Sequence, residues 1–271
     1  MKNTIRKTLL ACAVIATLGF SASASADQLF PDFTVDANIG SKNVVFTADK
    51  ITGNYVEIIN FSNAGTFHVD LYWKAAAFVS NDGVKSYDAG YTGLTVNYGL
   101  YAIYSADGIY SVNGNKTTFT FNPSTTGLLS VFLDPNLNTS YDANDQGTFT
   151  ATGTAGDIQL ATGKPVAGAG ELDKGLSTCK SGGGSGINCG SFGSTTTFEL
   201  TAAGEKFFTS PTPFYPLSFQ SGQLNNFNAG GRQVINGSLD VVFDVPEPAS
   251  VVLLGLGLVA LGLNRRRSKT I

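Results

Sequence analysis

The sequence predicts an all-β fold: an antiparallel β-sandwich of jelly-roll or immunoglobulin-like type, followed by a single apolar helix at the C-terminus. Three observations support this prediction. Short runs of apolar, β-branched and aromatic residues alternate with turns rich in Gly, Asn and Asp. Between residues 27 and 245, no segment of useful length has the 3.6-residue period of an amphipathic helix. No stretch repeats at a fixed period, which argues against a propeller or a solenoid.

The expected strands are short and follow one another closely along the chain. In order they are 43–49, 55–61, 66–74, 98–105, 109–112, 117–121, 128–133, 148–152, 158–161, 195–201, 214–219 and 239–243. The clearest is 66–74, where apolar and polar residues alternate as a half-buried antiparallel strand requires. Its expected core face holds Phe67, Val69, Leu71 and Trp73, and its expected solvent face holds His68, Asp70, Tyr72 and Lys74.

Two dipeptides that tolerate positive φ, Asp107-Gly108 and Asn113-Gly114, predict hairpin turns between the strands of 98–121. Residues 202–207 predict no more than one turn of helix. The glycine-rich interval 163–193 interrupts the strand pattern, and we interpret it as a candidate boundary between two subdomains of a single region, 27–245.

The charge of this region differs from that of the whole chain, whose net charge is −3. Three of the 17 Lys and Arg residues precede residue 27 and four follow residue 246, so ten remain against nineteen acids, a net charge of −9. Such an acidic surface argues against nucleic acid and anionic lipid as partners. It is typical of a secreted protein that stays soluble or meets cations.

The first 26 residues have the layout of a signal peptide. Three basic residues within the first seven precede an apolar run at 9–20, and Ala24-Ser25-Ala26 is an A-x-A cleavage site for signal peptidase. A lipoprotein box ending at Cys12 competes with this interpretation. We favour cleavage after Ala26, because the apolar run continues past Cys12.

The last 26 residues combine three features. Pro246-Glu247-Pro248 fixes an extended backbone, the apolar run 251–263 follows, and Arg265, Arg266 and Arg267 come next. A helix needs roughly 20 residues to cross a bilayer core, so this run is a short span. The arginines are expected to hold its far end in the cytoplasm.

This tail resembles the PEP-CTERM sorting signal, in which the same tripeptide, a Gly/Leu/Val helix and an Arg cluster occur in this order. The resemblance implies an exosortase as partner, which processes the tail near Pro246-Glu247-Pro248. It also implies export across the inner membrane of a Gram-negative bacterium and transient anchoring in the membrane. An ordinary tail anchor that begins with prolines is the alternative.

Two cysteines remain after the leader is removed. Cys179 and Cys189 flank a glycine-rich loop, and an even count in an exported chain predicts one disulfide. A redox or metal dithiol would need C-x-x-C spacing or nearby His, and the sequence has neither.

The sequence offers little that could carry catalysis. A Ser-His-Asp triad would have to use His68, the only histidine, but no G-x-S-x-G elbow is present. We therefore expect His68 to be a solvent-face strand residue beside Asp70. A glycosidase carboxylate pair stays open, because nineteen acids allow many pairs.

One polar loop has the spacing of oxygen ligands for calcium, the single cofactor that the sequence suggests. Counted from Asp134, positions 1, 3, 5, 9 and 12 are Asp134, Asn136, Asn138, Asp142 and Asp145. The loop departs from an EF-hand at Thr139, where Gly is usual, and no helices are expected to flank it. The alternative is a polar loop in which Asp134 makes a turn.

Beyond the tail, the chain is similar to the flocculation-associated PEP-CTERM proteins in four segments: 97–101, 133–135, the two-cysteine loop, and 197–201 running into 204–208. The resemblance implies a non-enzymatic protein of the cell surface or extracellular matrix that helps cells adhere within exopolysaccharide, as in flocs and biofilms. A secreted carbohydrate-binding protein or carbohydrate-active enzyme with the same tail is the alternative.

Overall fold

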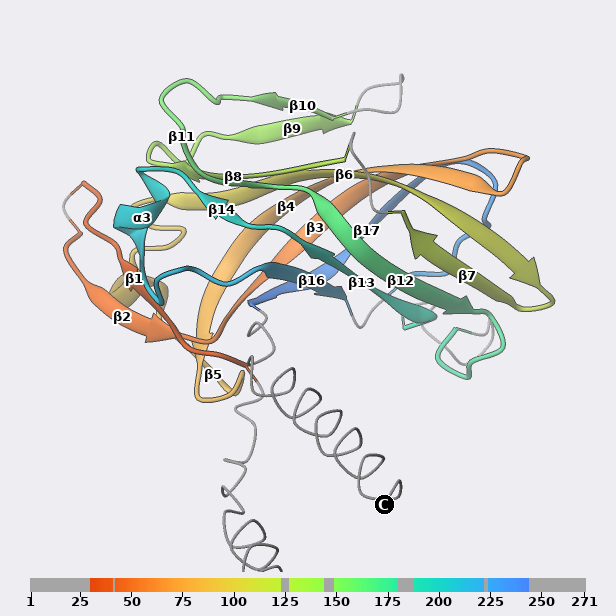
Figure 1. Cartoon of the computed structure of the whole chain (residues 1–271), viewed down its shortest axis with the longest axis horizontal. Helices are drawn as coiled ribbons and strands as arrows, with labels where there is room; N and C mark the ends of the chain where they lie inside the picture. The colour runs from red at the N-terminus through yellow and green to blue at the C-terminus, as the bar shows by residue number, and fades with distance from the viewer. Residues whose placement is uncertain are drawn as a thin grey trace, which may run out of the picture.

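The computed structural model describes residues 30–40, 42–122, 127–143, 149–179, 188–221 and 224–243. The predicted fold class is confirmed, because the described chain is mostly antiparallel β, in large curled sheets with a sandwich-like arrangement (Figure 1). The expected C-terminal apolar helix lies outside the described residues. Within them, no helix is long and apolar enough to cross a membrane.

Twelve strands form the main sheet. In spatial order they are β14 (Glu199–Leu200), β11 (Ile158–Gly163), β8 (Leu128–Asp134), β6 (Gly99–Asn113), β7 (Lys116–Phe121), β12 (Pro165–Asp173), β13 (Gly190–Thr196), β16 (Leu217–Ser221), β17 (Gly231–Phe243), β3 (Lys50–Phe61), β4 (Thr66–Ser80) and β5 (Lys85–Ser86).

Two smaller sheets and two short helices complete the described fold. One sheet has the order β15 (Phe208–Ser210), β1 (Phe33–Asp36), β2 (Val45–Ala48). The other is the hairpin of β9 (Ser140–Ala143) and β10 (Phe149–Thr152). The helices are α2 (Ala89–Thr92) and α3 (Gly204–Phe207), and α3 confirms the helical turn expected at 202–207.

The main sheet curls until two of its strands meet. β4 pairs with β6 from Thr66↔Ile109 to Lys74↔Tyr101, while the other edge of β6 pairs first with β8 and then with β7. The strands β6-β7-β12-β13-β16-β17-β3-β4 therefore close on themselves, and their inward side chains form the core.

β4 has the two faces that the alternation predicts. Phe67, Val69, Leu71 and Trp73 are all buried in the core. Tyr72 is the exception, because it lies on the outer face yet is also buried. The β9–β10 hairpin covers it there, with the Tyr72 ring 4.9 Å from that of Tyr141 (Figure 1). The cover comes from a segment about 70 residues away, which the local pattern cannot reveal.

The turn expected at Asp107-Gly108 is wrong, because β6 continues through it to Asn113. Gly108 pairs with Phe67, and a Cβ on Gly108 would lie 2.3 Å from the tip of the Phe67 ring. The glycine thus makes room for an aromatic side chain on the neighbouring strand, a common role of glycine within sheets. The second expected turn is present, since β6 and β7 form a hairpin around Gly114, whose φ is +59°.

The glycine-rich interval 163–193 contains two well-paired strands. β12 pairs with β7 and β13, and β13 pairs in turn with β16. The main sheet therefore runs without a break across the interval that we considered as a boundary between subdomains.

Candidate functional site

The last strand, β17, leads directly into the C-terminal tail. It pairs with β3 from Gly231↔Phe61 to Val242↔Lys50, and its second half also pairs with β16. The expected final strand at 239–243 is thus the end of a longer one. Its last residue, Phe243, is also the last described residue, so Pro246, Glu247, Pro248, Arg265, Arg266 and Arg267 lie outside the described residues.

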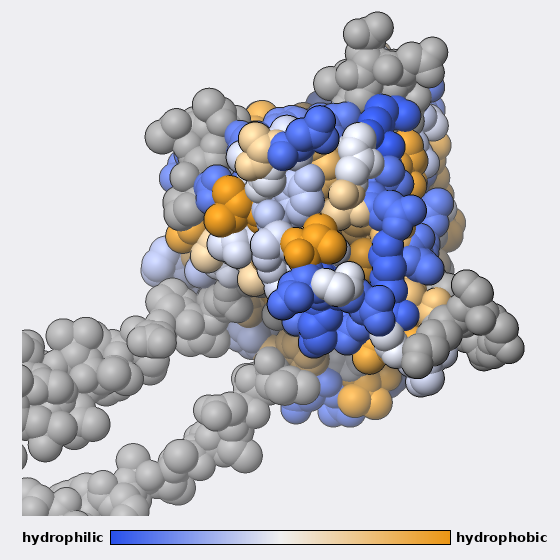
Figure 2. Space-filling view, turned by 90° about the vertical axis from the view of Figure 1, so that its right-hand side faces the viewer, coloured by the Kyte–Doolittle hydropathy of each residue, from blue (hydrophilic) through white to orange (hydrophobic). Residues whose placement is uncertain are grey.

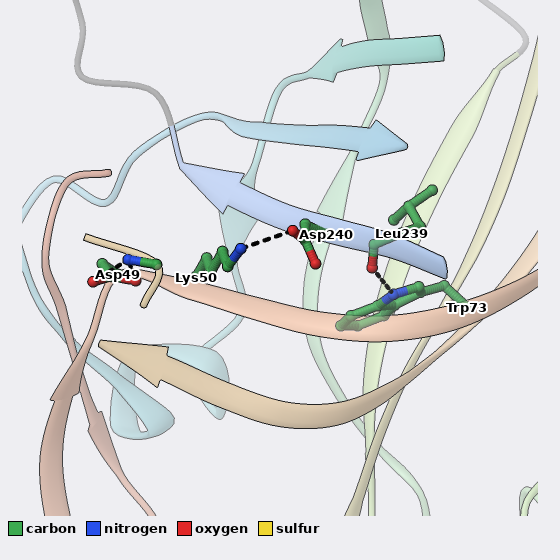
Figure 3. A network of polar contacts seen from close by, with 6 residues as sticks. Asp49, Lys50, Trp73, Leu239 and Asp240 are labelled. Atoms are coloured by element: carbon green, nitrogen blue, oxygen red, sulfur yellow. Dashed lines mark hydrogen bonds and ion pairs between the residues drawn. The ribbon is translucent and has the colours of Figure 1, made fainter. Parts of the chain in front are cut away.

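Two polar contacts secure the end of β17 against β3 and β4 (Figure 3). The Trp73 indole Nε1 donates a buried hydrogen bond to the Leu239 carbonyl over 3.0 Å. The Lys50 ammonium lies 2.9 Å from the Asp240 carboxylate, and both side chains are partly buried. Each contact joins residues more than 160 positions apart in the sequence.

A buried carboxylate holds the neighbouring β4–β5 turn to the start of β3. Both Asp49 oxygens accept from the Gly83 amide, at 3.2 and 3.1 Å (Figure 3). Asp49 is fully buried, and this burial raises its pKa despite the hydrogen bonds. The strands that carry the tail are therefore fixed by buried polar contacts as well as by their ladders.

The Phe243 ring brings the two ends of the folded domain together. It lies 4.9 Å from Phe33, which begins β1, and 4.9 Å from Phe214. Phe243 and Phe33 are both almost fully buried in an aromatic cluster that also includes Phe198 and Phe208. The chain therefore enters and leaves the domain at one end.

Comparison with known protein families identifies the segment that follows β17. The family model of the PEP-CTERM protein-sorting motif matches residues 244–267. The chain carries a PEP-CTERM sorting signal. The match begins at Asp244, directly after β17 ends, and it contains the tripeptide and the three arginines. No curated protein and no solved structure matches the chain.

The PEP-CTERM motif implies an exported protein that an exosortase processes. Only Asp244 and Val245 separate Phe243 from Pro246. Three residues of extended chain reach at most about 10 Å, so the motif starts close to the folded domain.

The predicted disulfide between Cys179 and Cys189 is confirmed. Both cysteines are buried, and the Cys189 amide donates to the Leu224 carbonyl over 2.7 Å. The crosslink thus joins the start of β13 to the end of the 173–179 turn. The loop between the cysteines falls outside the described residues.

The calcium prediction falls on a turn that the structure describes in part. Asp134 is buried at the end of β8, and its two oxygens accept from the backbone amides of Asn136, at 2.9 Å, and Thr139, at 2.8 Å. Burial opposes ionisation of Asp134, but these hydrogen bonds outweigh it and lower the pKa. The alternative interpretation, a turn closed by Asp134, accounts for this geometry.

The other expected calcium ligands are described only in part. Asn136 and Asn138 are exposed, Asp142 is exposed on β9, and Asp145 lies outside the described residues. Across the described ranges, no three His, Cys, Asp or Glu side chains group as metal ligands. Calcium binding at this loop stays a prediction.

A second carboxylate, which no sequence pattern predicted, lies beside this turn. Asp157 Oδ2 accepts from the Thr139 hydroxyl and from the Tyr101 hydroxyl, each over 2.7 Å. Asp157 comes from β11's preceding turn, and only the β8–β11 pairing brings it here.

His68 lies between two carboxylates on the outer face of β4. Its Nε2 is 3.4 Å from Asp70, and its Nδ1 is 2.8 Å from Asp107 on β6. Asp70 and Asp107 together raise the His68 pKa to about 9, against the opposing effect of partial burial. His68 is therefore a charged partner of two acids on a half-exposed surface. The strand pattern predicted the contact with Asp70 but not the one with Asp107.

A broad groove lies between the small β1–β2–β15 sheet and the ends of β8 and β11. Its volume is about 840 Å³. Asp36, Asn38 and Lys206 supply polar groups, and apolar residues such as Ile158 and Phe207 line the rest. One Asp36 oxygen is buried and has no hydrogen-bond partner among the described residues. A groove of this size with a few polar groups has the character of a ligand site.

Proposed function

We propose that this protein is a non-enzymatic component of the cell surface or extracellular matrix that promotes adhesion between cells within exopolysaccharide. The export step, the exosortase and transient anchoring by the tail deliver a folded β-domain to this place. The observation that carries the proposal is the sorting motif at 244–267, which starts directly where β17 ends.

The build of the domain supports a structural role. A closed circuit of strands, a disulfide and one hydrophobic core rich in aromatic residues are features that would suit a protein working outside the cell. The one histidine is held between Asp70 and Asp107, outside the groove beside the β1–β2–β15 sheet.

The proposal is tested by deleting the gene and, in a separate strain, only residues 246–271. Loss of the gene should reduce aggregation of the cells, and restoring the full gene should recover it. Loss of the tail should release a folded domain from the envelope and also reduce aggregation. Normal aggregation in both strains would contradict the matrix role.

The groove favours one alternative, a carbohydrate-binding protein. Its polar groups could hydrogen-bond to sugar hydroxyls, and its apolar residues could pack against sugar rings. A glycosidase needs two carboxyl groups about 5 to 9.5 Å apart. Asp36 is the only acidic residue among the described residues that line the groove, so the groove favours binding over hydrolysis.

This alternative is tested by binding of purified protein to the polysaccharide of the same cells. Asp36→Asn combined with Lys206→Met should abolish binding, whereas Lys164→Met, at an exposed site outside the groove, should not change it. Release of reducing sugar by the wild-type protein would instead indicate a carbohydrate-active enzyme.

A further inference from the structure

A single carboxyl group lies in the core, inside the circuit of strands. Glu57 sits on β3 with the same inward parity as Tyr55 and Ile59, and only 3% of its surface is exposed. Its neighbours on the flanking strands are Leu71 of β4 and Ile235 of β17, both buried and apolar. A carboxyl group rarely occupies such a place without a partner, because its desolvation is costly.

The surroundings of Glu57 leave its carboxyl group without a compensating charge. Burial is the one cause that raises its pKa, to about 8, and no hydrogen bond or ion among the described residues acts against it. On β6, the Tyr104 phenol has its pKa raised by burial and, to a smaller extent, by Glu57, and its hydroxyl bonds to that of Ser194 over 2.7 Å. Tyr55, on β3 itself, is the other phenol on this inner face.

The carboxyl group borders a small pocket with aromatic walls. Five phenylalanines line it with Glu57, namely Phe67, Phe119, Phe121, Phe192 and Phe227. The cavity has a volume of about 20 Å³, which is enough for one group the size of a water molecule. Phe192 is partly exposed, so one wall of the pocket reaches the surface.

The pocket lies toward one end of the molecule. Phe67 directly follows the β3–β4 turn, and Phe119 and Phe121 lie on β7 in the β6–β7 hairpin. Both turns lie at the right-hand end of Figure 1, the end that faces the viewer in Figure 2. Hydrophobic residues show near the centre of that face, with hydrophilic residues around them (Figure 2).

We infer that this pocket binds a primary ammonium group, with Glu57 as its counter-ion and the phenylalanine rings as its cage. The faces of aromatic rings attract cations, and an ammonium head is about the size of the water-sized group that fits. An alkyl chain attached to the nitrogen would leave along the apolar wall at Phe192. This inference goes beyond the proposed role in adhesion and does not depend on it.

The chemistry of binding includes a proton. Below about pH 8 the free pocket holds Glu57 as a neutral acid. When an alkylammonium ion enters, the ammonium keeps its charge and the carboxyl group loses its proton to solvent, so one proton is released for each cation bound. Linkage then requires the apparent dissociation constant to rise about tenfold for each pH unit below the Glu57 pKa.

The test is calorimetry of the exported protein with methylammonium and n-butylammonium at pH 6 and pH 7, in buffers of different ionisation enthalpy. Methanol and n-butanol are the neutral controls. We expect binding of the amines with release of about one proton, weaker by about tenfold at pH 6, and no comparable binding of the alcohols.

Variants separate the cage from the counter-ion. Glu57→Gln keeps the neutral shape that the acid has at pH 7, so the protein should fold, but amine binding and proton release should be lost. Phe192→Leu should weaken amine binding and leave the wild-type proton release at saturation. Amine binding that is equal in Glu57→Gln, alcohol binding as strong as amine binding, or no amine binding to the wild-type protein would each overturn the proposal.

Discussion

The buried Glu57 carboxyl group should make the free energy of unfolding depend on pH. The carboxyl pKa is 4.5 in its ordinary state and about 8 in the folded protein. Between these pH values the folded state binds a proton on Glu57 that the unfolded state has lost. The stabilisation that comes from this bound proton is complete below pH 4.5 and is lost as the pH rises toward 8. One pKa unit corresponds to about 1.4 kcal/mol, and a shift of this size therefore corresponds to about 5 kcal/mol in all.

The perturbation is Glu57→Gln, which stays neutral at every pH. The free energy of unfolding of this variant, relative to wild type, should rise by about 4 kcal/mol between pH 5 and pH 8. Urea unfolding followed by fluorescence measures it directly, because Trp73 is the only tryptophan and is buried. Glu199→Gln, at an exposed position on β14, is the matched control and should leave the pH dependence unchanged. Parallel pH profiles for wild type and Glu57→Gln would refute a neutral, unpartnered acid in the core.

Three further predictions concern the disulfide, the Asp134 turn and His68. Cys179 and Cys189 should resist thiol labelling until reduced, and replacing both with alanine should cost about 2–3 kcal/mol by loop entropy; labelling without reductant would contradict the crosslink. Asp134→Ala should lower the free energy of unfolding in urea by about 3 kcal/mol, because it leaves the backbone amides of Asn136 and Thr139 without acceptors. If the turn binds Ca²⁺, calcium at ten times Kd should add about 1.4 kcal/mol to wild-type stability over chelator, and equal melting temperatures would reject calcium. The single histidine resonance should titrate near pH 9 by NMR, and a midpoint near 6.5 would contradict the contact with two acids. The stabilisation from protonated His68 should be complete below pH 6.5 and lost as the pH rises through 9. Because His68 is half-exposed, this stabilisation should not exceed about 1 kcal/mol.

Much of the fold followed from local pattern. The alternation in 66–74 predicted which side chains of β4 enter the core, and the two cysteines predicted their crosslink, because both signals lie within about ten residues of chain. Glu57 shares the parity of Tyr55 and Ile59, so the same alternation could have placed it in the core. A charged residue in an apolar row was the available signal.

The rest depends on contacts between distant segments. The β4–β6 pairing that closes the sheet, and the insertion of β12 and β13 between β7 and β16, have no local signature. Gly108 was mistaken for a turn residue because the space that it leaves is filled by Phe67, some forty positions earlier. The two backbone amides that bond to Asp134 could not be predicted either, because a pattern of side chains does not show the path of the backbone after β8.

The sorting motif implies that an exosortase processes the exported protein. Because Pro246 follows the last residue of β17 by three positions, the motif begins within about 10 Å of the end of that strand. The control variant is Glu199→Gln, which leaves the motif intact.

The most direct test is the intact mass of the exported protein in cells with the exosortase, for wild type and for Pro246→Ala, Glu247→Ala and Pro248→Ala combined. We expect the wild-type protein to lack the apolar run and the three arginines, and the triple variant to keep them and stay with the membrane. A triple variant that is cut and released like the wild type would contradict processing by an exosortase at this motif.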